Sequence, residues 1–269
     1  ACLLLPAAAA VGWVRRAEPA VRFAVCWLVP TWLVFEIVPT KLVHYTLPAY
    51  GGAILLMVLA LAQPLGRLTR GLGAGVLALG GLVLAAAMIV VAGRYGSGGS
   101  MAWAVLAAIL FVGAVAAGGW FLVRRQTVLA AVSAGALAAA AHGLVVSALA
   151  PGLSPLWLSP RLAAAVRSTG LDPRQAVVAG PIAVAGFAEP SAVFLLGTPT
   201  TLTDAAGAAA ALRAGRPAIV GPAEEAAVRA VLPGLGPPAA RVQGLNYSDG
   251  RPRDLRLLRP PTPSPQAPP

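Results

Sequence analysis

The sequence predicts an α-helical membrane bundle of about six spans, the first one truncated, followed by a small extracytoplasmic α/β domain. Of the 269 residues, 58% are hydrophobic and only 11% are charged, whereas soluble domains carry roughly 25% charged residues. The acidic side chains are also unevenly placed: residues 1–150 contain only Glu18 and Glu36, and the other seven follow. The chain therefore divides into a lipid-embedded part and an aqueous part.

Apolar runs account for the spans. The runs long enough to cross a hydrocarbon core of roughly 30 Å are Val21–Val38, Thr46–Ala62, Leu72–Ala92, Met101–Val123 and Thr127–Leu149. Pro30 predicts a kink in the first of these runs. The preceding run, Ala1–Val14, would reach only about 21 Å as a helix. Because it has neither a starting Met nor a basic signal-peptide region, we expect the polypeptide to extend upstream.

Arginines in alternate turns predict the orientation. Arg15 with Arg16, Arg67 with Arg70, and Arg124 with Arg125 would all fall on one side of the bundle. Cytoplasmic loops are enriched in Lys and Arg, so that side is assigned to the cytoplasm. The turns 39–45 and 93–100, and everything after Pro151, would then face outward.

Residues 151–259 show the mixed pattern of an aqueous α/β domain after the transmembrane region 1–150. Its expected helices are Pro160–Ser168, Thr203–Arg213 and Ala223–Leu232, and its expected strands are Val177–Phe187, Ala192–Gly197 and Ala218–Val220. The segments Arg241–Tyr247 and Arg253–Arg259 flank Asp249-Gly250 and predict a hairpin. Residues 260–269 form a Pro-rich tail that we expect to be disordered.

Several functional classes are excluded by composition. The net charge of +11 does not indicate nucleic-acid binding, because the arginines of the first half sit in short clusters between apolar runs. Two Cys and two His cannot build a structural zinc site here, because they do not have the usual spacing of zinc ligands. A Ser-His-Asp triad is not expected either, because His44 and His142 both lie at membrane depth.

Candidate chemistry gathers in the outward turn between the second and third predicted spans. This short segment contains Glu36, Lys41, His44, Tyr45 and Tyr50. Charged groups at the edge of the hydrocarbon are costly unless they reach water or serve a ligand. An ammonium, an imidazole and a phenol suit an anionic phosphate. Interfacial anchoring is the alternative, and spacing alone favours it because Tyr and Lys are enriched at this depth.

A family resemblance favours the phosphate interpretation. The residues that carry it in the turn are Phe35-Glu36, Pro39-Thr40-Lys41-Leu42, His44-Tyr45, Leu47-Pro48 and Tyr50. Further along, Val184–Ser191, Phe194–Thr198 and Gly244–Ser248 contribute. Together they resemble the C-terminal half of ArnT-like, protein-mannosyltransferase-related glycosyltransferases of the GT-C type. These enzymes take a sugar from a polyprenyl-phosphate carrier.

The resemblance implies roles for particular residues. Lys41 and Tyr45 match the basic and aromatic positions near the lipid-phosphate pocket, and His44 occupies a position that varies. Val43 stands where a proline is common. The acidic pair that the family uses for catalysis would precede residue 1, so no residue here inherits that role, and the chain alone is expected to be inactive. Glu36 is the minor catalytic candidate, with an ion pair to Lys41 or to an upstream residue as the favoured alternative.

The resemblance further implies a multi-pass protein of the bacterial inner membrane with its C-terminal domain in the periplasm. Its partners would be the bilayer, the polyprenyl-phosphate sugar donor and a lipid A-type or other envelope acceptor. No cofactor is predicted except a divalent metal held mainly by upstream residues. The alternatives are a non-catalytic membrane scaffold and a transporter. A transporter should show paired repeats with broken helices, and only Pro30 interrupts the centre of a span.

Overall fold

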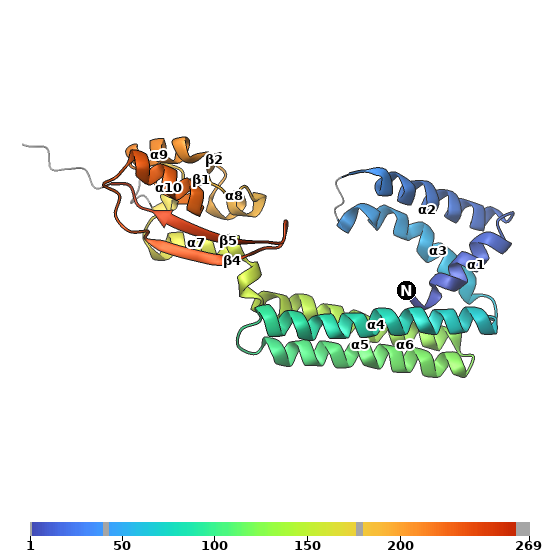
Figure 1. Ribbon diagram of the computed structural model, residues 1–269. Coiled ribbons are helices and arrows are strands. Elements are labelled where there is room, and N and C mark those ends of the chain that lie inside the picture. Colours follow the sequence, from blue (N-terminus) through green and yellow to red (C-terminus); the bar gives the residue numbers. More distant parts are fainter. Residues whose placement is uncertain (1, 40–42, 176–179, 262–269) are drawn as a thin grey trace, which may run out of the picture. The chain divides into compact units, whose positions relative to one another are not determined.

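The computed structural model describes residues 2–39, 43–175 and 180–261, and it divides the chain into two compact units, Ala1–Gly152 and Leu153–Pro269. Figure 1 shows a helical first unit and a mixed α/β second unit. This architecture confirms the predicted fold class. Placement of the second unit on the extracytoplasmic side stays a prediction. The Pro-rich tail lies almost entirely outside the described residues.

The first unit is built from helices. In chain order these are the 3₁₀ turn η1 (Cys2–Leu4), α1 (Leu5–Val14), α2 (Pro19–Ile37), the 3₁₀ turn η2 (Val43–Ala49), α3 (Tyr50–Leu61), α4 (Arg67–Tyr95), α5 (Ser100–Val123) and α6 (Thr127–Leu144). A π-helical turn, Val145–Leu149, and the 3₁₀ turn Ala150–Gly152 extend α6.

Five helical segments in the described residues are long and apolar enough to cross a membrane, with the shorter apolar stretch Cys2–Val14 in front of them. They coincide with the five predicted spans, and their ends shift by a few residues. At 29 residues, α4 is about 43 Å long, which is ample for a tilted span. The helix α2 continues through Pro30 to Ile37. The chain is therefore a multi-pass membrane protein.

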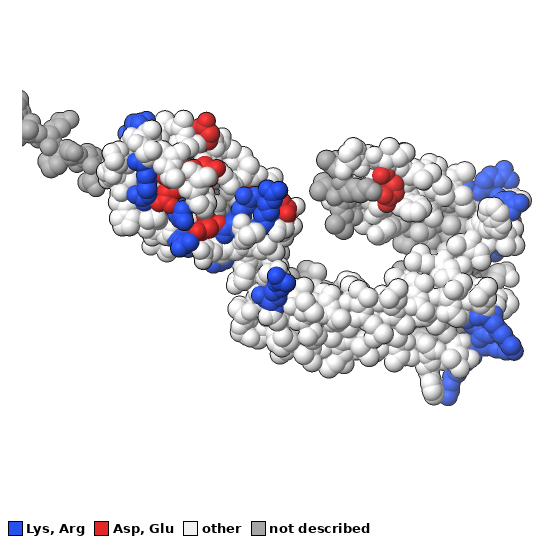
Figure 2. Space-filling view, in the orientation of Figure 1, with Lys and Arg blue, Asp and Glu red and all other residues white. Residues whose placement is uncertain are grey.

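Small residues hold the three long helices together. Figure 1 shows α4, α5 and α6 side by side, with α5 in contact with both neighbours. The buried positions of α5 are mostly Ala and Gly, including Ala104, Ala107, Ala114 and Gly118. Small side chains let helix backbones approach closely in lipid, where no hydrophobic force drives helices together. On the face shown in Figure 2, the length of this bundle carries no charged atoms and Lys and Arg lie near its ends.

The hairpin of α2 and α3 depends on a still closer approach. Gly52 of α3 lies against the backbone of α2, where a Cβ atom would be 2.7 Å from the carbonyl oxygen of Ala24 and 2.9 Å from the amide nitrogen of Leu28. Only glycine fits such a crossing without displacing backbone. Because η2 leads directly into α3, this contact also places the end of η2 beside α2.

The second unit contains one five-stranded sheet. Its helical elements are the 3₁₀ turn η5 (Ser154–Leu156), α7 (Leu158–Ser168), the 3₁₀ turn η6 (Pro173–Gln175), α8 (Pro190–Leu196), α9 (Ala205–Arg213) and α10 (Pro222–Val231). Its strands are β1 (Ala183–Ala185), β2 (Thr201–Thr203), β3 (Ala218–Val220), β4 (Ala240–Asn246) and β5 (Arg251–Leu258). The strand order is β2-β1-β3-β5-β4. β1 pairs in parallel with β2 and β3, and β5 pairs antiparallel with β3 and β4.

Helices cover both faces of this sheet. On one face α7 and α8 bury Leu162 and Leu196 against Val184 and Ile219. On the other face α9 and α10 pack Leu212 and Val228 against a second set of strand residues. The three-residue strands β1 and β3 are buried throughout, as expected for parallel strands with helices on both sides.

Helices α7, α9 and α10, strand β3 and the β4–β5 hairpin lie where the sequence predicts them. At the start of α9 the side chain of Asp204 accepts a hydrogen bond from the Gly207 amide (2.8 Å). This cap is the feature that identifies the helix in the sequence. Gly215 follows its end with φ +75°, the left-handed conformation that commonly terminates a helix.

Two strand predictions are wrong in part or in full. Ala192–Gly197 is not a strand, because Pro190 starts helix α8 there. Ala192 and Leu196 are buried while Phe194 is exposed, which is helical spacing that a six-residue apolar run does not reveal. Of Val177–Phe187 only β1 is a strand, and residues 176–179 lie outside the described ranges. The short strand β2 was not predicted.

The α2–α3 crossing gives a first prediction. Gly52→Ala should lower the stability of the bundle, by about 1–3 kcal/mol for forced overpacking, and should lower its melting temperature in detergent. Gly71→Ala is the matched control, because nothing lies within 4 Å of a Cβ at that position of α4 and alanine favours helix. Equal melting temperatures for the two variants would contradict the close approach.

Candidate functional site

The predicted site turn begins where α2 stops. Pro39 follows Val38, whose backbone is extended (φ −65°, ψ 125°), because the residue before a proline avoids helical angles. The chain then enters η2 at Val43. Phe35 and Glu36 therefore belong to the last turn of α2, whereas His44 and Tyr45 belong to η2. Lys41 lies outside the described residues.

Three rings pack together across this turn. The Phe35 and Tyr45 rings are tilted by 31° with centroids 5.5 Å apart. The His44 ring meets Tyr45 edge-on, at 82° and 5.2 Å. Such offset and T-shaped pairs are favourable arrangements of aromatic rings. The packing orients the Tyr45 phenol and leaves the His44 imidazole exposed.

The structure thus brings together two of the predicted binding residues, His44 and Tyr45. Glu36 is exposed next to Phe35. The binding roles of Lys41, His44 and Tyr45 stay predictions. Within the described ranges, no group of three or more His, Cys, Asp or Glu side chains is placed to hold a metal ion.

His142 lies in the second half of α6. Its Nδ1 lies 2.7 Å from the carbonyl oxygen of Ala138, one turn earlier in α6. Its ring meets Phe111 of α5 edge-on at 5.1 Å. These contacts are those of a residue that packs between α5 and α6.

A second polar cluster forms in the α/β unit from residues that sequence reasoning did not connect. Glu189 accepts hydrogen bonds from Asn246 Nδ2 (2.7 Å) and from Ser248 Oγ (3.2 Å). Asn246 is buried, and its amide oxygen accepts from the Ser248 amide (3.1 Å). The side chains of Asn246 and Ser248 are therefore both engaged in hydrogen bonds within the unit. Two of the segments that carry the family resemblance meet in this cluster.

The same cluster borders a small cavity of about 140 Å³. Ser159 and Ser191 hydrogen-bond at its wall (2.8 Å between hydroxyls). Trp157 and Tyr247 form a T-shaped pair, with centroids 5.9 Å apart. Trp157 and Ser159 were missed because their partners lie on distant segments, and only the packing of α7 against α8 and β4 brings them together.

Taken together, the elements define a multi-pass helical membrane protein with a mixed α/β domain after its last span. No protein-family model matches the sequence, and no curated protein matches it significantly. Two solved structures do match in fold. They are ArnT from Cupriavidus metallidurans in the apo state (TM-score 0.58, 18% identity) and ArnT from the same organism bound to undecaprenyl phosphate (TM-score 0.58, 17% identity).

The likeness covers 94% of this chain and 49% and 48% of the two ArnT chains, respectively. The chain thus spans about half the length of the proteins it resembles. At this level of identity the comparison establishes the fold, which is that of ArnT over the matched part. The predicted resemblance is confirmed to that extent.

The Glu189 cluster yields a stability prediction. Asn246→Ala removes the shorter of two hydrogen bonds to a partly buried carboxylate, so it should destabilise the unit by about 1–3 kcal/mol. Hydrogen exchange of the β4 and β5 amides should then become faster. Ser248→Ala, which removes the longer bond at an exposed position, should have the smaller effect. The reverse ranking would show that Asn246 does not organise the cluster.

Proposed function

We propose that the chain is part of a membrane glycosyltransferase that moves a sugar from a polyprenyl-phosphate carrier to an acceptor. The acceptor would be a lipid A-type glycolipid or another envelope molecule at the outer face of the inner membrane. The observation that carries the proposal is the ArnT fold over 94% of the chain. One of the two matching structures is a complex with undecaprenyl phosphate, which supports a lipid-phosphate donor here.

The turn between α2 and α3 is the proposed donor-phosphate site. It lies at the end of a membrane-spanning helix, where a lipid headgroup would meet the protein. The Tyr45 hydroxyl can donate a hydrogen bond to a phosphate oxygen, and Phe35 and His44 hold its ring in place. A protonated His44 and the Lys41 ammonium would add positive charge.

Charge at this position suits the proposed reaction. When an acceptor oxygen attacks the anomeric carbon, the bond from that carbon to the phosphate oxygen breaks and the phosphate leaves with the bonding electrons. Cations already in place stabilise the negative charge that develops on the leaving group. Glu36 is kept as a minor candidate for proton transfer. The described residues supply no ligand set for a divalent metal, so no step is assigned to one.

Lys41 provides the direct test in the full-length protein. Lys41→Met keeps the apolar stem and removes the ammonium, so transfer should fall at least about tenfold, the loss expected for one hydrogen bond to a charged group. Lys41→Arg should retain part of the activity. The measurement is sugar transfer from a polyprenyl-phosphate donor in isolated membranes, normalised to protein level.

Arg94→Met is the matched control, because Arg94 ends α4 in another predicted outward turn and lies over the Tyr95 ring. It should leave transfer near normal. Near-normal transfer by Lys41→Met would support interfacial anchoring and remove the phosphate assignment.

The proposal also requires that the α2–α3 turn and the α/β unit face outward. A reporter that is active only in the periplasm should be active when fused after Pro151 and silent when fused at Arg124. The reason is that Arg124 belongs to one of the arginine pairs assigned to the cytoplasm. The opposite pattern would invert the topology and place the turn on the wrong side for an outer-leaflet donor.

A further inference from the structure

The order of strands in the α/β unit creates a crevice outside the ends of two parallel strands. From β1 the chain passes through α8 to β2 on one side, and from β2 it returns through α9 to β3 on the other side. The helices that follow β1 and β3 then cover opposite faces, with α8 in one core cluster and α10 in the other. The segments that follow β1 and β3 therefore run to opposite faces of the sheet, which leaves an opening beyond the carboxyl ends of these two strands. Ligands in open α/β sheets bind at such topological switch points.

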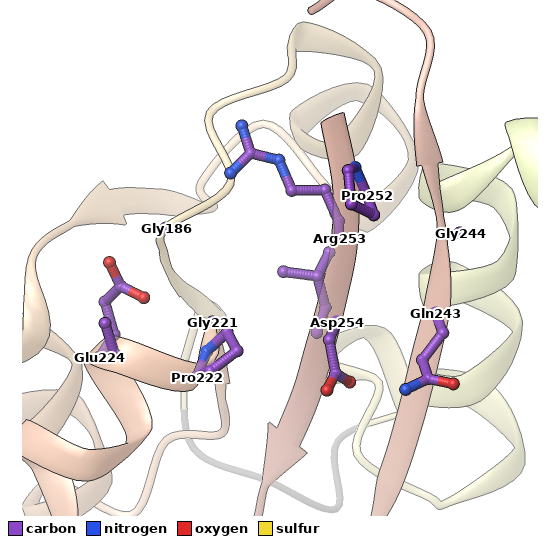
Figure 3. Close-up of a pocket in the computed structure, with 11 residues that line it drawn as sticks. Gly186, Gly221, Pro222, Glu224, Gln243, Gly244, Pro252, Arg253 and Asp254 are labelled. Carbon is purple, nitrogen blue, oxygen red and sulfur yellow. The ribbon is translucent and has the colours of Figure 1, made fainter. Parts of the chain in front are cut away.

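A cavity occupies this position. It has a volume of about 610 Å³, within the range of roughly 300–1,000 Å³ typical of small-molecule sites. Gly186 and Gly221, the first residues after β1 and β3, line it together with residues of α10, β4 and β5. We call it the switch-point crevice (Figure 3).

A carboxylate lines the crevice beside the ends of β1 and β3. A Cβ atom on Gly186 or on Gly221 would come within 2.6 Å of Glu224 Oε2. The two glycines thus leave room for this oxygen over the ends of both strands. Glu224 is partly buried, and the described part of the chain offers its carboxylate no hydrogen-bond or ion-pair partner.

Helix capping does not explain Glu224. In a capping box, a glutamate three residues after the N-cap accepts a hydrogen bond from the N-cap amide. Here the N-cap is Gly221, and its amide already donates to the carbonyl oxygen of Ala185 (3.1 Å). The neighbouring Glu225 contrasts with Glu224, because Arg229 and Arg256 both pair with it at 2.7 Å.

The opposite wall supplies a donor. Arg253 of β5 extends toward the loop that contains Gly186 (Figure 3). Its Nη2 donates to Asp249 (2.5 Å), and its Nε is enclosed by protein atoms and out of a ligand's reach. Nη1 is therefore the nitrogen of this guanidinium that can donate to a ligand, because the described residues give it no hydrogen-bond partner. Asp254, also in the crevice wall, is already committed to Arg241 and Arg256. Hydrogen bonds from Arg241 lower the pKa of Asp254 below its ordinary value, so this pairing persists at neutral pH.

The Glu224 carboxylate and the Arg253 guanidinium indicate which kind of ligand the crevice binds. Glu224 would repel a phosphate, even though the start of α10 would otherwise favour an anion. A neutral hydroxyl can both donate to the Glu224 carboxylate and accept from the Arg253 guanidinium. We propose that the switch-point crevice binds a saccharide through its hydroxyl groups. The choice of a saccharide among polyhydroxylated ligands rests on the proposed glycosyl-transfer function.

Binding of methyl α-D-glucopyranoside to the purified chain tests this inference. The chain should be held in a detergent without a sugar headgroup, and binding followed by saturation-transfer NMR titration. The wild type should bind saturably, and Glu224→Gln should bind at least about tenfold more weakly, as expected for loss of a charged hydrogen-bond partner. No saturable binding by the wild type, or equal binding by the variant, would overturn the proposal.

Gly221→Ala tests the shape of the crevice and leaves the charge of Glu224 unchanged. The backbone of Gly221 has φ −77°, which alanine also adopts, so the new Cβ acts only by displacing the Glu224 carboxylate. It should weaken sugar binding, whereas Gly234→Ala, with open space around the new Cβ, should not. Equal affinities for the two variants would show that this carboxylate position does not matter. Circular dichroism should confirm that each variant is folded.

Two further titrations separate this inference from the proposed function. Undecaprenyl phosphate should bind the wild type and the crevice variants equally, because the proposed donor site is in the α2–α3 turn. Loss of lipid-phosphate binding with intact sugar binding would contradict the proposed function alone. Displacement of the sugar by inorganic phosphate would contradict a neutral ligand in the crevice.

Discussion

In hydrocarbon every backbone amide and carbonyl must find a partner within the protein, and a helix provides one within its own segment. The first unit is organised around that requirement. Its membrane-spanning segments are helical, and each departs from helix only near its ends. Pro39 shows the effect clearly, because α2 ends at Ile37, two residues before this proline. Side chains able to meet a polar headgroup are therefore confined to the connecting turns. The turn between α2 and α3 collects more of them than the turn between α4 and α5.

Close helix contact then determines the geometry of that turn. Gly52 allows the beginning of α3 to touch the backbone in the middle of α2, so η2, which leads into α3, runs beside the last part of α2. Phe35 of α2 and Tyr45 of η2 are thereby brought within ring contact. Packing of small residues, rather than any charge interaction, thus places the aromatic part of the proposed donor site.

The aqueous unit obeys a different constraint. Its parallel strands are only three residues long and fully buried, so helices must cover both faces. The segments after β1 and β3 lead to helices on opposite faces of the sheet. The switch-point crevice, which contains Glu224, lies where these segments part. In the crevice, Glu224 and Arg253 face one cavity from two elements.

The sequence predicts the spans well because long apolar runs have one stable form in lipid. It also predicts α9 and the β4–β5 hairpin, where Asp204 and Asp249-Gly250 provide local signals. It fails at Ala192–Gly197, because a short apolar run fits a buried strand and a buried helix equally. It also misses the Glu189–Asn246 pair and the switch-point crevice. Both depend on strand order, which no local pattern encodes, and Glu224 alone is typical of any helix start.

The central claim is that the α2–α3 turn holds a lipid phosphate, and site-specific photocrosslinking in native membranes tests it most directly. A photoreactive amino acid would replace His44, whose exposed ring borders Tyr45, or Arg94 in the α4–α5 turn. Mass spectrometry would then identify the captured lipid. Undecaprenyl phosphate should be captured from position 44 and not from position 94. Capture at position 94 alone, or equal capture at both, would contradict the central claim.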